Sequence, residues 1–175
     1  MSAPFRRLLV ANRGEIAVRI LRTCRELGIE TVAVYSDADA GALHVRLADR
    51  AVRLGPAPAS ESYLHADALV EAAVATGAEA VHPGYGFLSA RSSFGAGGEA
   101  AGLAFVGPAP QTLASRGEKL EARATATAAG VPIVPGMFDP LPTGDAAAVA
   151  RIEELAAEIG YPLLIKAAAG GGGRG

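Results

Sequence analysis

Short apolar runs recur along residues 1–106, and most are followed by a longer segment with apolar residues at helical spacing. Continuous apolar runs of this length are typical of strands buried within a sheet. The runs are Leu8–Ala11, Thr31–Tyr35, Ala51–Leu54, Ala78–Val81 and Leu103–Val106. Strands that alternate with helices at this rhythm predict a parallel, doubly wound α/β sheet.

The first helix has the clearest pattern. It is expected to follow the turn Asn12–Glu15 and to end at Gly28, a helix-stop residue. Glu15–Arg19 and Arg22–Glu26 are i,i+4 pairs on its polar side. Its apolar face is expected to carry Ile16, Ile20, Leu21, Cys24 and Leu27.

Two further helices are expected over residues 65–76 and 89–101. The second contains Gly95, Gly97 and Gly98, and each glycine is less favourable in a helix than alanine by roughly 1 kcal/mol. We therefore expect this helix to be weak.

The pattern changes after Gly107–Pro110. Two short helices are expected over residues 111–115 and 119–129, and a loop rich in Pro and Gly occupies residues 135–144. A domain boundary is therefore expected near residues 108–118.

One more helix is expected after this loop. Asp145 is a plausible N-cap. An apolar stripe at helical spacing follows, formed by Val149, Ile152, Ala156 and Ile159.

Composition narrows the classes of function. The chain has 175 residues, of which 50% are hydrophobic, so it is long enough for a sizeable core. Its net charge of −2, without a basic block, argues against nucleic acid or an acidic membrane surface as the main partner. The single Cys24 excludes an internal disulfide framework and a multi-cysteine zinc site. The N-terminus resembles neither a signal peptide nor a membrane span, so we expect a cytoplasmic protein.

The last residues carry the most specific chemistry. The apolar run Tyr161–Ile165 predicts a strand, Lys166 follows it, and Gly170–Gly175 is glycine throughout except for Arg174. Backbone N–H groups without side chains can surround phosphate oxygens, and a lysine adds a positive charge. No Gly-Lys-Ser/Thr sequence follows, so this is not a Walker loop. A flexible tail or linker is the alternative. Because the chain stops within this loop, we interpret it as the front part of a nucleotide-using enzyme.

Binding of a dinucleotide such as NAD is disfavoured. The first strand-to-helix turn contains one glycine, whereas the dinucleotide fingerprint has three. Asp37 and Asp39 lie near the position of a ribose-binding acid, but we interpret them as solvated loop acids.

A second turn, His82–Gly86, follows the fourth predicted strand. Gly84 and Gly86 flank Tyr85 and allow a tight turn at a carboxyl strand end, where open α/β sheets bind ligands. The alternative is a structural turn that orients the next helix. We interpret His82 as a hydrogen-bonded core histidine and Glu118 as a solvated first-turn carboxylate; Lys119 by itself would be a surface lysine.

Together these segments resemble the biotin carboxylase family, the ATP-dependent component of acetyl-CoA, propionyl-CoA and pyruvate-type carboxylases. The resemblance covers almost the whole chain. It lies in LLVANRGEIAVRILRTCRELGIETVAVYSDAD, ALHVRLADRAVRLGPAPASESYL, HPGYGFLS, GLAFVGPAP, AGVPIVPG and IGYPLLIKAAAGGGGRG.

The resemblance implies a Rossmann-like N-terminal domain over residues 1–115 and the start of an ATP-grasp domain over residues 116–175, truncated in the glycine-rich loop. It implies ATP-contacting roles for Lys119 and Lys166 and for the backbone of Gly172 and Gly173. Arg19 matches a family arginine at the homodimer interface.

The family uses MgATP and bicarbonate to carboxylate biotin on a carrier protein, in partnership with a carboxyltransferase. The family's metal, bicarbonate and biotin residues lie beyond the glycine loop, so the resemblance assigns no catalytic or metal residue here. We expect the isolated chain to be inactive. The alternative is a non-catalytic, truncated paralogue that acts as a dimerisation or interaction module.

Two departures from the family pattern stand out. Ala90-Arg91 replaces a Glu-Asn pair, which mildly favours the interaction-module alternative. Gly117-Glu118-Lys119 replaces Gly-Asp-Lys and leaves the lysine in place.

Overall fold

A computed structural model describes residues 4–117, 119–136, 141, 144 and 146–165. The chain divides into two compact units, residues 1–114 and 115–175.

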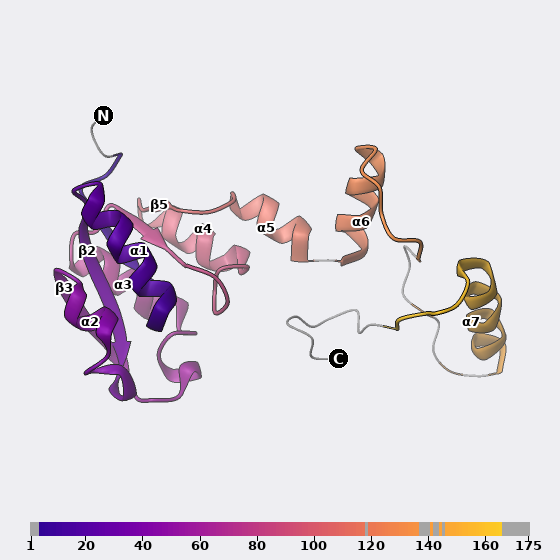
Figure 1. Cartoon of the computed structure of the whole chain (residues 1–175), viewed down its shortest axis with the longest axis horizontal. Helices are drawn as coiled ribbons and strands as arrows, with labels where there is room; N and C mark the ends of the chain where they lie inside the picture. The colour runs from indigo at the N-terminus through magenta and orange to yellow at the C-terminus, as the bar shows by residue number, and fades with distance from the viewer. Residues whose placement is uncertain (1–3, 118, 137–140, 142–143, 145, 166–175) are drawn as a thin grey trace. The chain divides into compact units, whose positions relative to one another are not determined.

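The first unit is built on a five-stranded sheet (Figure 1). Its strands are β1 (Arg7–Val10), β2 (Glu30–Ser36), β3 (Arg50–Gly55), β4 (Ala80–His82) and β5 (Ala104–Phe105). All neighbours are parallel, in the order β3-β2-β1-β4-β5. Strands β2 and β3 lie on one side of β1, and β4 and β5 lie on the other. Leu9 of β1 therefore pairs with both Val32 of β2 and Val81 of β4. The predicted parallel sheet is confirmed.

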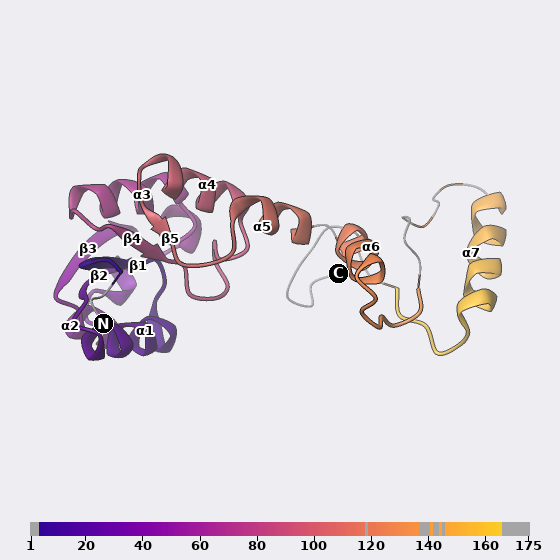
Figure 2. The same cartoon turned by 90° about the horizontal axis from the view of Figure 1, so that it is seen from above.

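Helices cover both faces of the sheet, as Figure 2 shows from above. On one face lie α1 (Gly14–Glu26) and α2 (Leu43–Leu47), and on the other lie α3 (Ala66–Ala75) and α4 (Ser92–Ala100). Two 3₁₀ turns, η1 (Asp37–Asp39) and η2 (Ala59–Glu61), complete the unit. The sequence did not predict α2, because five residues are too few for a helical period to show.

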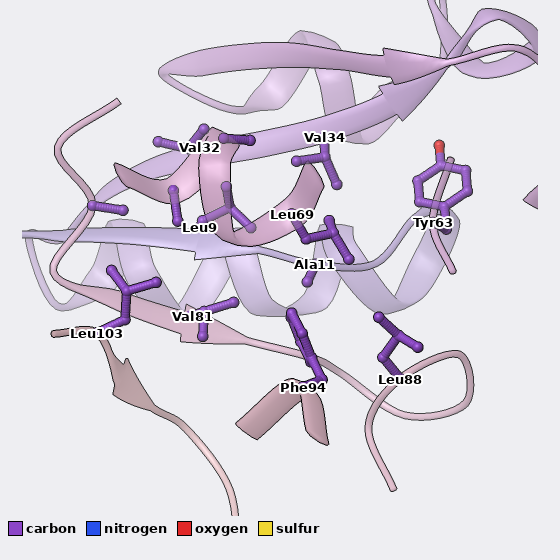
Figure 3. Close-up of a cluster of buried hydrophobic side chains, with 13 residues drawn as sticks. Leu9, Ala11, Val32, Val34, Tyr63, Leu69, Val81, Leu88, Phe94 and Leu103 are labelled. Carbon is purple, nitrogen blue, oxygen red and sulfur yellow. The ribbon is translucent and has the colours of Figure 1, made fainter. Parts of the chain in front are cut away.

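Alternate residues of the strands supply two hydrophobic cores, one on each face. Figure 3 shows Leu9 and Val81 in the first core, together with Leu69 of α3 and Phe94 of α4. The second core joins Leu8, Val10 and Ala80 of the sheet to Ala17, Leu21 and Cys24 of α1 and to Ile29.

The buried face of α1 differs from the prediction. Ala17 and Val18 are buried, whereas Leu27 is 60% exposed. Leu27 is the C-cap, and Gly28 at φ +70° turns the chain so that Ile29 enters the core instead. The helix therefore ends one residue before its expected last core position.

Helix α4 forms despite its glycines, but over fewer residues than expected. Gly95 and Gly98 are buried against neighbouring elements. A Cβ at Gly98 would lie 3.6 Å from Val81, which is ordinary van der Waals contact. Gly98 therefore allows close packing against Val81, but an alanine would also fit at this position.

The second unit contains α6 (Lys119–Ala128) and α7 (Ala146–Ile159), while α5 (Pro110–Gly117) spans the division between the units. Asp145, the expected N-cap of α7, lies outside the described residues. Among the described residues, no helix is long and apolar enough to cross a membrane.

The prediction of a strand at Tyr161–Ile165 is wrong. These residues form a bend and irregular chain, and Tyr161, Leu164 and Ile165 are 80%, 77% and 74% exposed. A strand needs a hydrogen-bonding neighbour, and no other strand occurs in the described part of this unit.

Candidate functional site at the carboxyl edge of the sheet

Two turns leave the sheet side by side at its carboxyl edge. One joins β1 to α1 through Asn12 and Arg13, and the other is His82–Gly86 after β4. Because β1 and β4 pair in parallel, their carboxyl ends meet, and open α/β sheets bind ligands at this edge.

Asn12 ties the two turns together. Its side chain is buried, and its Nδ2 donates to the carbonyls of Pro83 at 2.8 Å and Tyr85 at 3.0 Å. Its Oδ1 accepts from the Arg13 N–H at 2.9 Å. Gly84 packs against this amide at φ +66°, and a Cβ there would come within 2.7 Å of both Asn12 Nδ2 and Ile16. Only glycine fits this position.

Tyr85 projects from the turn and is mostly exposed. Its hydroxyl donates to Glu15 Oε1 at 2.5 Å, and this bond raises the pKa of Tyr85. Glu15 therefore pairs with the turn and not with Arg19 as the sequence suggested. Neither expected i,i+4 ion pair of α1 is among those formed in the described residues.

His82 is half-buried, and its Nδ1 accepts a 3.0 Å hydrogen bond from the Gly84 N–H. Burial lowers the pKa of His82 and so favours the neutral ring that this bond needs. The interpretation as a hydrogen-bonded core histidine fits this geometry.

Asp39 is not the solvated loop acid that the sequence suggested. It is 7% exposed and accepts from Arg13 at 2.7 Å and from the Tyr63 hydroxyl at 2.6 Å. Burial alone would raise the pKa of Asp39, but the two hydrogen bonds outweigh it and lower the pKa. Asp37, by contrast, is exposed and pairs with Arg53 at 2.7 Å, so the interpretation holds for that residue.

Tyr63 connects this carboxylate to Phe87, the residue that follows the second turn. Its ring stacks on Phe87 with centroids 5.3 Å apart, and the Arg13 guanidinium lies 5.8 Å from its centroid. Burial and the bond to Asp39 raise the pKa of Tyr63 to about 12. The Tyr63 ring therefore contacts both Arg13 and Phe87, two residues that line the carboxyl edge of the sheet.

The two turns enclose a hollow of about 260 Å³ that opens to solvent. It is lined by Asn12, Arg13, Ile16, Tyr85, Gly86 and Phe87. A larger, shallow depression of about 760 Å³ lies along α1, where Arg19, Arg22 and Leu43 are among its lining residues. Among the described residues, no group of three His, Cys, Asp or Glu side chains could hold a metal ion.

Residues 4–113 match the family described as "Biotin carboxylase, N-terminal domain". The chain belongs to the biotin carboxylase family. Residues 118–175 match a second family, described as "Carbamoyl-phosphate synthase L chain, ATP binding domain".

Curated relatives match along the whole chain. It is 53% identical over 175 residues to the biotin carboxylase of Allochromatium vinosum, covering 100% of this chain and 38% of that protein. It is 56% identical over 169 residues to the alpha subunit of mitochondrial methylcrotonoyl-CoA carboxylase from Oryza sativa subsp. japonica, covering 97% and 22%. The chain thus spans well under half the length of these relatives.

Solved structures of biotin carboxylases share the fold. A complex of Campylobacter jejuni biotin carboxylase with β-γ-ATP matches with a TM-score of 0.88 at 43% identity, over 97% of this chain and 37% of that one. The biotin carboxylase domain dimer of Hydrogenobacter thermophilus 2-oxoglutarate carboxylase, with MgADP, ADP and bicarbonate, matches with a TM-score of 0.87 at 46% identity, over 97% and 36%.

In this member of the biotin carboxylase family, the residues expected to contact ATP lie in the second unit. Lys119 is the first residue of α6. Lys166, Gly172 and Gly173 lie outside the described residues. The phosphate site that these four residues would form stays a prediction.

Sequence reasoning missed Asn12, Asp39 and Tyr63 as parts of the site. Tyr63 is 24 residues from Asp39, and Asn12 is 71 residues from Pro83. No local pattern signals such pairings, because they depend on which strands become neighbours.

Proposed function

We propose that this chain is the N-terminal part of a biotin carboxylase, a ligase that uses MgATP and bicarbonate to carboxylate biotin on a carrier protein. The observation that carries the proposal is the 53% identity to a biotin carboxylase over all 175 residues. A match of this length includes both units and every segment with candidate chemistry.

In this proposal, residues 1–115 form the Rossmann-like domain and residues 116–175 begin the ATP-grasp domain. Lys119 and Lys166 contact ATP phosphates, and the backbone of Gly172 and Gly173 closes over them. Support comes from the match of residues 118–175 to an ATP-binding domain. Lysine ammonium and glycine N–H groups suit the oxygens of a triphosphate. When bound, Mg²⁺ supplies charge neutralisation of that triphosphate.

The hollow at the carboxyl edge forms part of the substrate site in this proposal. Biotin is the substrate proposed for this hollow, although the resemblance assigns no biotin residue to this chain. Its ring system is uncharged and largely apolar, and the residues proposed to contact ATP lie in the second unit. Ile16, Tyr85 and Phe87 offer an apolar lining at the edge where such sheets bind ligands.

The partners proposed are a biotin carboxyl carrier, a carboxyltransferase and a second copy of the chain with Arg19 near the interface. Arg19 lines the depression along α1, and it forms no ion pair with the described residues. The matching H. thermophilus structure is a domain dimer. A cytoplasmic location completes the proposal.

Fixation of labelled bicarbonate tests the proposed function. The protein that carries this chain should transfer label to free biotin only when ATP and Mg²⁺ are present. Lys119→Met and Lys166→Met should each lower kcat/KM for ATP by about tenfold or more, because a charge-assisted bond contributes roughly 1.5–3 kcal/mol. Arg151→Met, which removes an exposed cation on α7, is the matched control. Absence of biotin-dependent turnover in the unaltered protein would refute the proposal.

The 175-residue chain alone should show no turnover in the same assay. Catalysis needs charge stabilisation of the transition state, and removal of such groups costs orders of magnitude in rate. Appreciable biotin carboxylation by the isolated chain would show that it contains a complete active site.

A further inference from the structure

We infer that Asn12 is a positioning residue, which fixes the turn His82–Gly86 and thereby the place of Tyr85 at the proposed substrate hollow. The inference rests on the proposed function for the assignment of the hollow to a substrate. The contacts of Asn12 are observed whether or not that function is correct.

Asn12 is suited to this role because its amide has donors and an acceptor on one short side chain. It is 0% exposed and makes three hydrogen bonds, two to the carbonyls of the second turn and one from its own turn. The side chain therefore clamps the end of β4 to the start of α1 across 71 to 73 positions of sequence.

The turn itself has few other restraints. Gly84, Gly86 and Phe87 have φ values of +66°, +69° and +43°, so the turn continues neither a helix nor a strand. Apart from the Asn12 bonds and the Tyr85–Glu15 bond, Ala11 N–H donates to the His82 carbonyl at 2.9 Å. Gly84 N–H donates to the His82 ring, and Ser89 N–H donates to the Gly86 carbonyl at 2.9 Å. Glycines leave such a turn many alternative conformations when an external clamp is removed.

Tyr85 is the residue of the turn whose contacts would report such a change in conformation. Its carbonyl is bound by Asn12, and its hydroxyl reaches Glu15 at 2.5 Å. The Glu15 bond is exposed and competes with water, whereas the Asn12 bond to Pro83 is buried and that to Tyr85 is part-buried. Loss of the Asn12 clamp should therefore also weaken the Tyr85–Glu15 bond.

Asn12→Ala removes all three hydrogen bonds without adding charge. Asn12→Asp keeps the acceptor for the Arg13 N–H but removes the donor to Pro83 and Tyr85. Thr31→Val is the matched control, because Thr31 is also buried and its hydroxyl donates at 2.7 Å to Asp49 near the amino end of β2. Loss of that bond lowers stability away from the hollow.

The first measurement uses the 175-residue chain and the titration of tyrosine resonances by NMR. In Asn12→Ala the pKa of Tyr85 should fall toward its ordinary value, because the hydroxyl leaves Glu15. In Thr31→Val it should stay at its elevated position. An unchanged Tyr85 titration in a folded Asn12→Ala chain would overturn the inference.

The second measurement uses the whole carboxylase and separates KM from kcat. Both Asn12 variants should raise KM for free biotin by about tenfold, with KM for ATP within about twofold, since a small displacement of a binding wall has large kinetic effects. Thr31→Val should change neither constant. If the Asn12 variants altered both KM values equally, the role would be merely structural and the inference would fail.

Failure of the proposed function is distinguishable from failure of this inference. A whole protein without biotin-dependent turnover refutes the function, while the Tyr85 titration still decides whether Asn12 positions the turn. If Asn12→Ala does not fold, amide hydrogen exchange at Gly84 in Asn12→Asp tests the same inference. Protection of the Gly84 amide equal to that in the unaltered chain would overturn it.

Discussion

The hydroxyl of Tyr63 donates a 2.6 Å hydrogen bond to the buried carboxylate of Asp39. The same hydroxyl accepts from the Ser36 N–H at 3.1 Å, at the carboxyl end of β2. One phenol thus satisfies a buried carboxylate and a buried backbone donor, and its ring supports Phe87 of the hollow. Stability and the shape of the candidate site are therefore linked through this residue.

Tyr63→Phe should lower the free energy of unfolding by about 1–3 kcal/mol, because it leaves a buried donor and part of a buried carboxylate unsatisfied. Urea denaturation of the 175-residue chain measures the change. Tyr35→Phe is the matched control: it removes a half-buried hydroxyl with no hydrogen-bond partner among the described residues and should cost less than about 0.5 kcal/mol. Equal effects of the two variants would contradict the prediction.

Stability should fall as the pH is lowered through the range in which His44 gains a proton. Its ring is 0% exposed, and burial lowers the pKa of His44 below the ordinary value of about 6.5. Nε2–H donates to the Val34 carbonyl at 3.2 Å, whereas the buried Nδ1 has no hydrogen-bond partner among the described residues. Protonation would place an unsatisfied N–H at Nδ1, so the neutral ring is the form that fits.

A lowered folded-state pKa means that the stabilisation is complete above about pH 6.5 and is lost as the pH falls through the folded-state pKa. The free energy of unfolding should therefore decrease between pH 7 and pH 5. His44→Gln, which keeps a donor for Val34, should show a smaller decrease. His82 titrates in both proteins, so the difference between them reports His44. Identical pH slopes would argue against a neutral buried His44.

Two glycines should respond oppositely to alanine. Gly97 in α4 has open space at its Cβ position, so Gly97→Ala should stabilise the chain by about 0.5–1 kcal/mol. Gly84 has φ +66° and no room beside Asn12, so Gly84→Ala should destabilise it by more than about 1 kcal/mol. Thermal unfolding of both variants checks the contrast, and a stabilising Gly84→Ala would exclude the described turn.

Charge reversal on α1 should weaken the self-association proposed above. Arg19→Glu and Arg22→Glu both place a carboxylate in the depression proposed as an interface, where an unpaired buried charge is costly. Sedimentation velocity should show a shift from dimer to monomer. Glu99→Arg, on α4 at the opposite face of the sheet, should leave the dimer intact. A dimer unaffected by both α1 variants would place the interface elsewhere.

The alternation of apolar runs and helical segments was enough to predict the five parallel strands and helices α1, α3 and α4. Gly28 correctly marked the end of α1, because the chain turns there through a left-handed backbone conformation that glycine adopts at low cost. Residues 161–165 show the limit of this reasoning. Their apolar run reads as a strand, but strand formation depends on a hydrogen-bonding neighbour that the run itself does not specify.

What the sequence determined by itself is the five strands, helices α1, α3 and α4, and the family, because periodicity and glycine positions act over a few residues and family motifs are read directly. The tertiary structure alone decided that Asp39 is buried, that Glu15 bonds Tyr85 and that Asn12 clamps the second turn. These contacts join residues brought together by the pairing of β1 with β2 and β4. Hydrogen bonds between distant segments depend on that strand order, which local patterns of polarity do not encode.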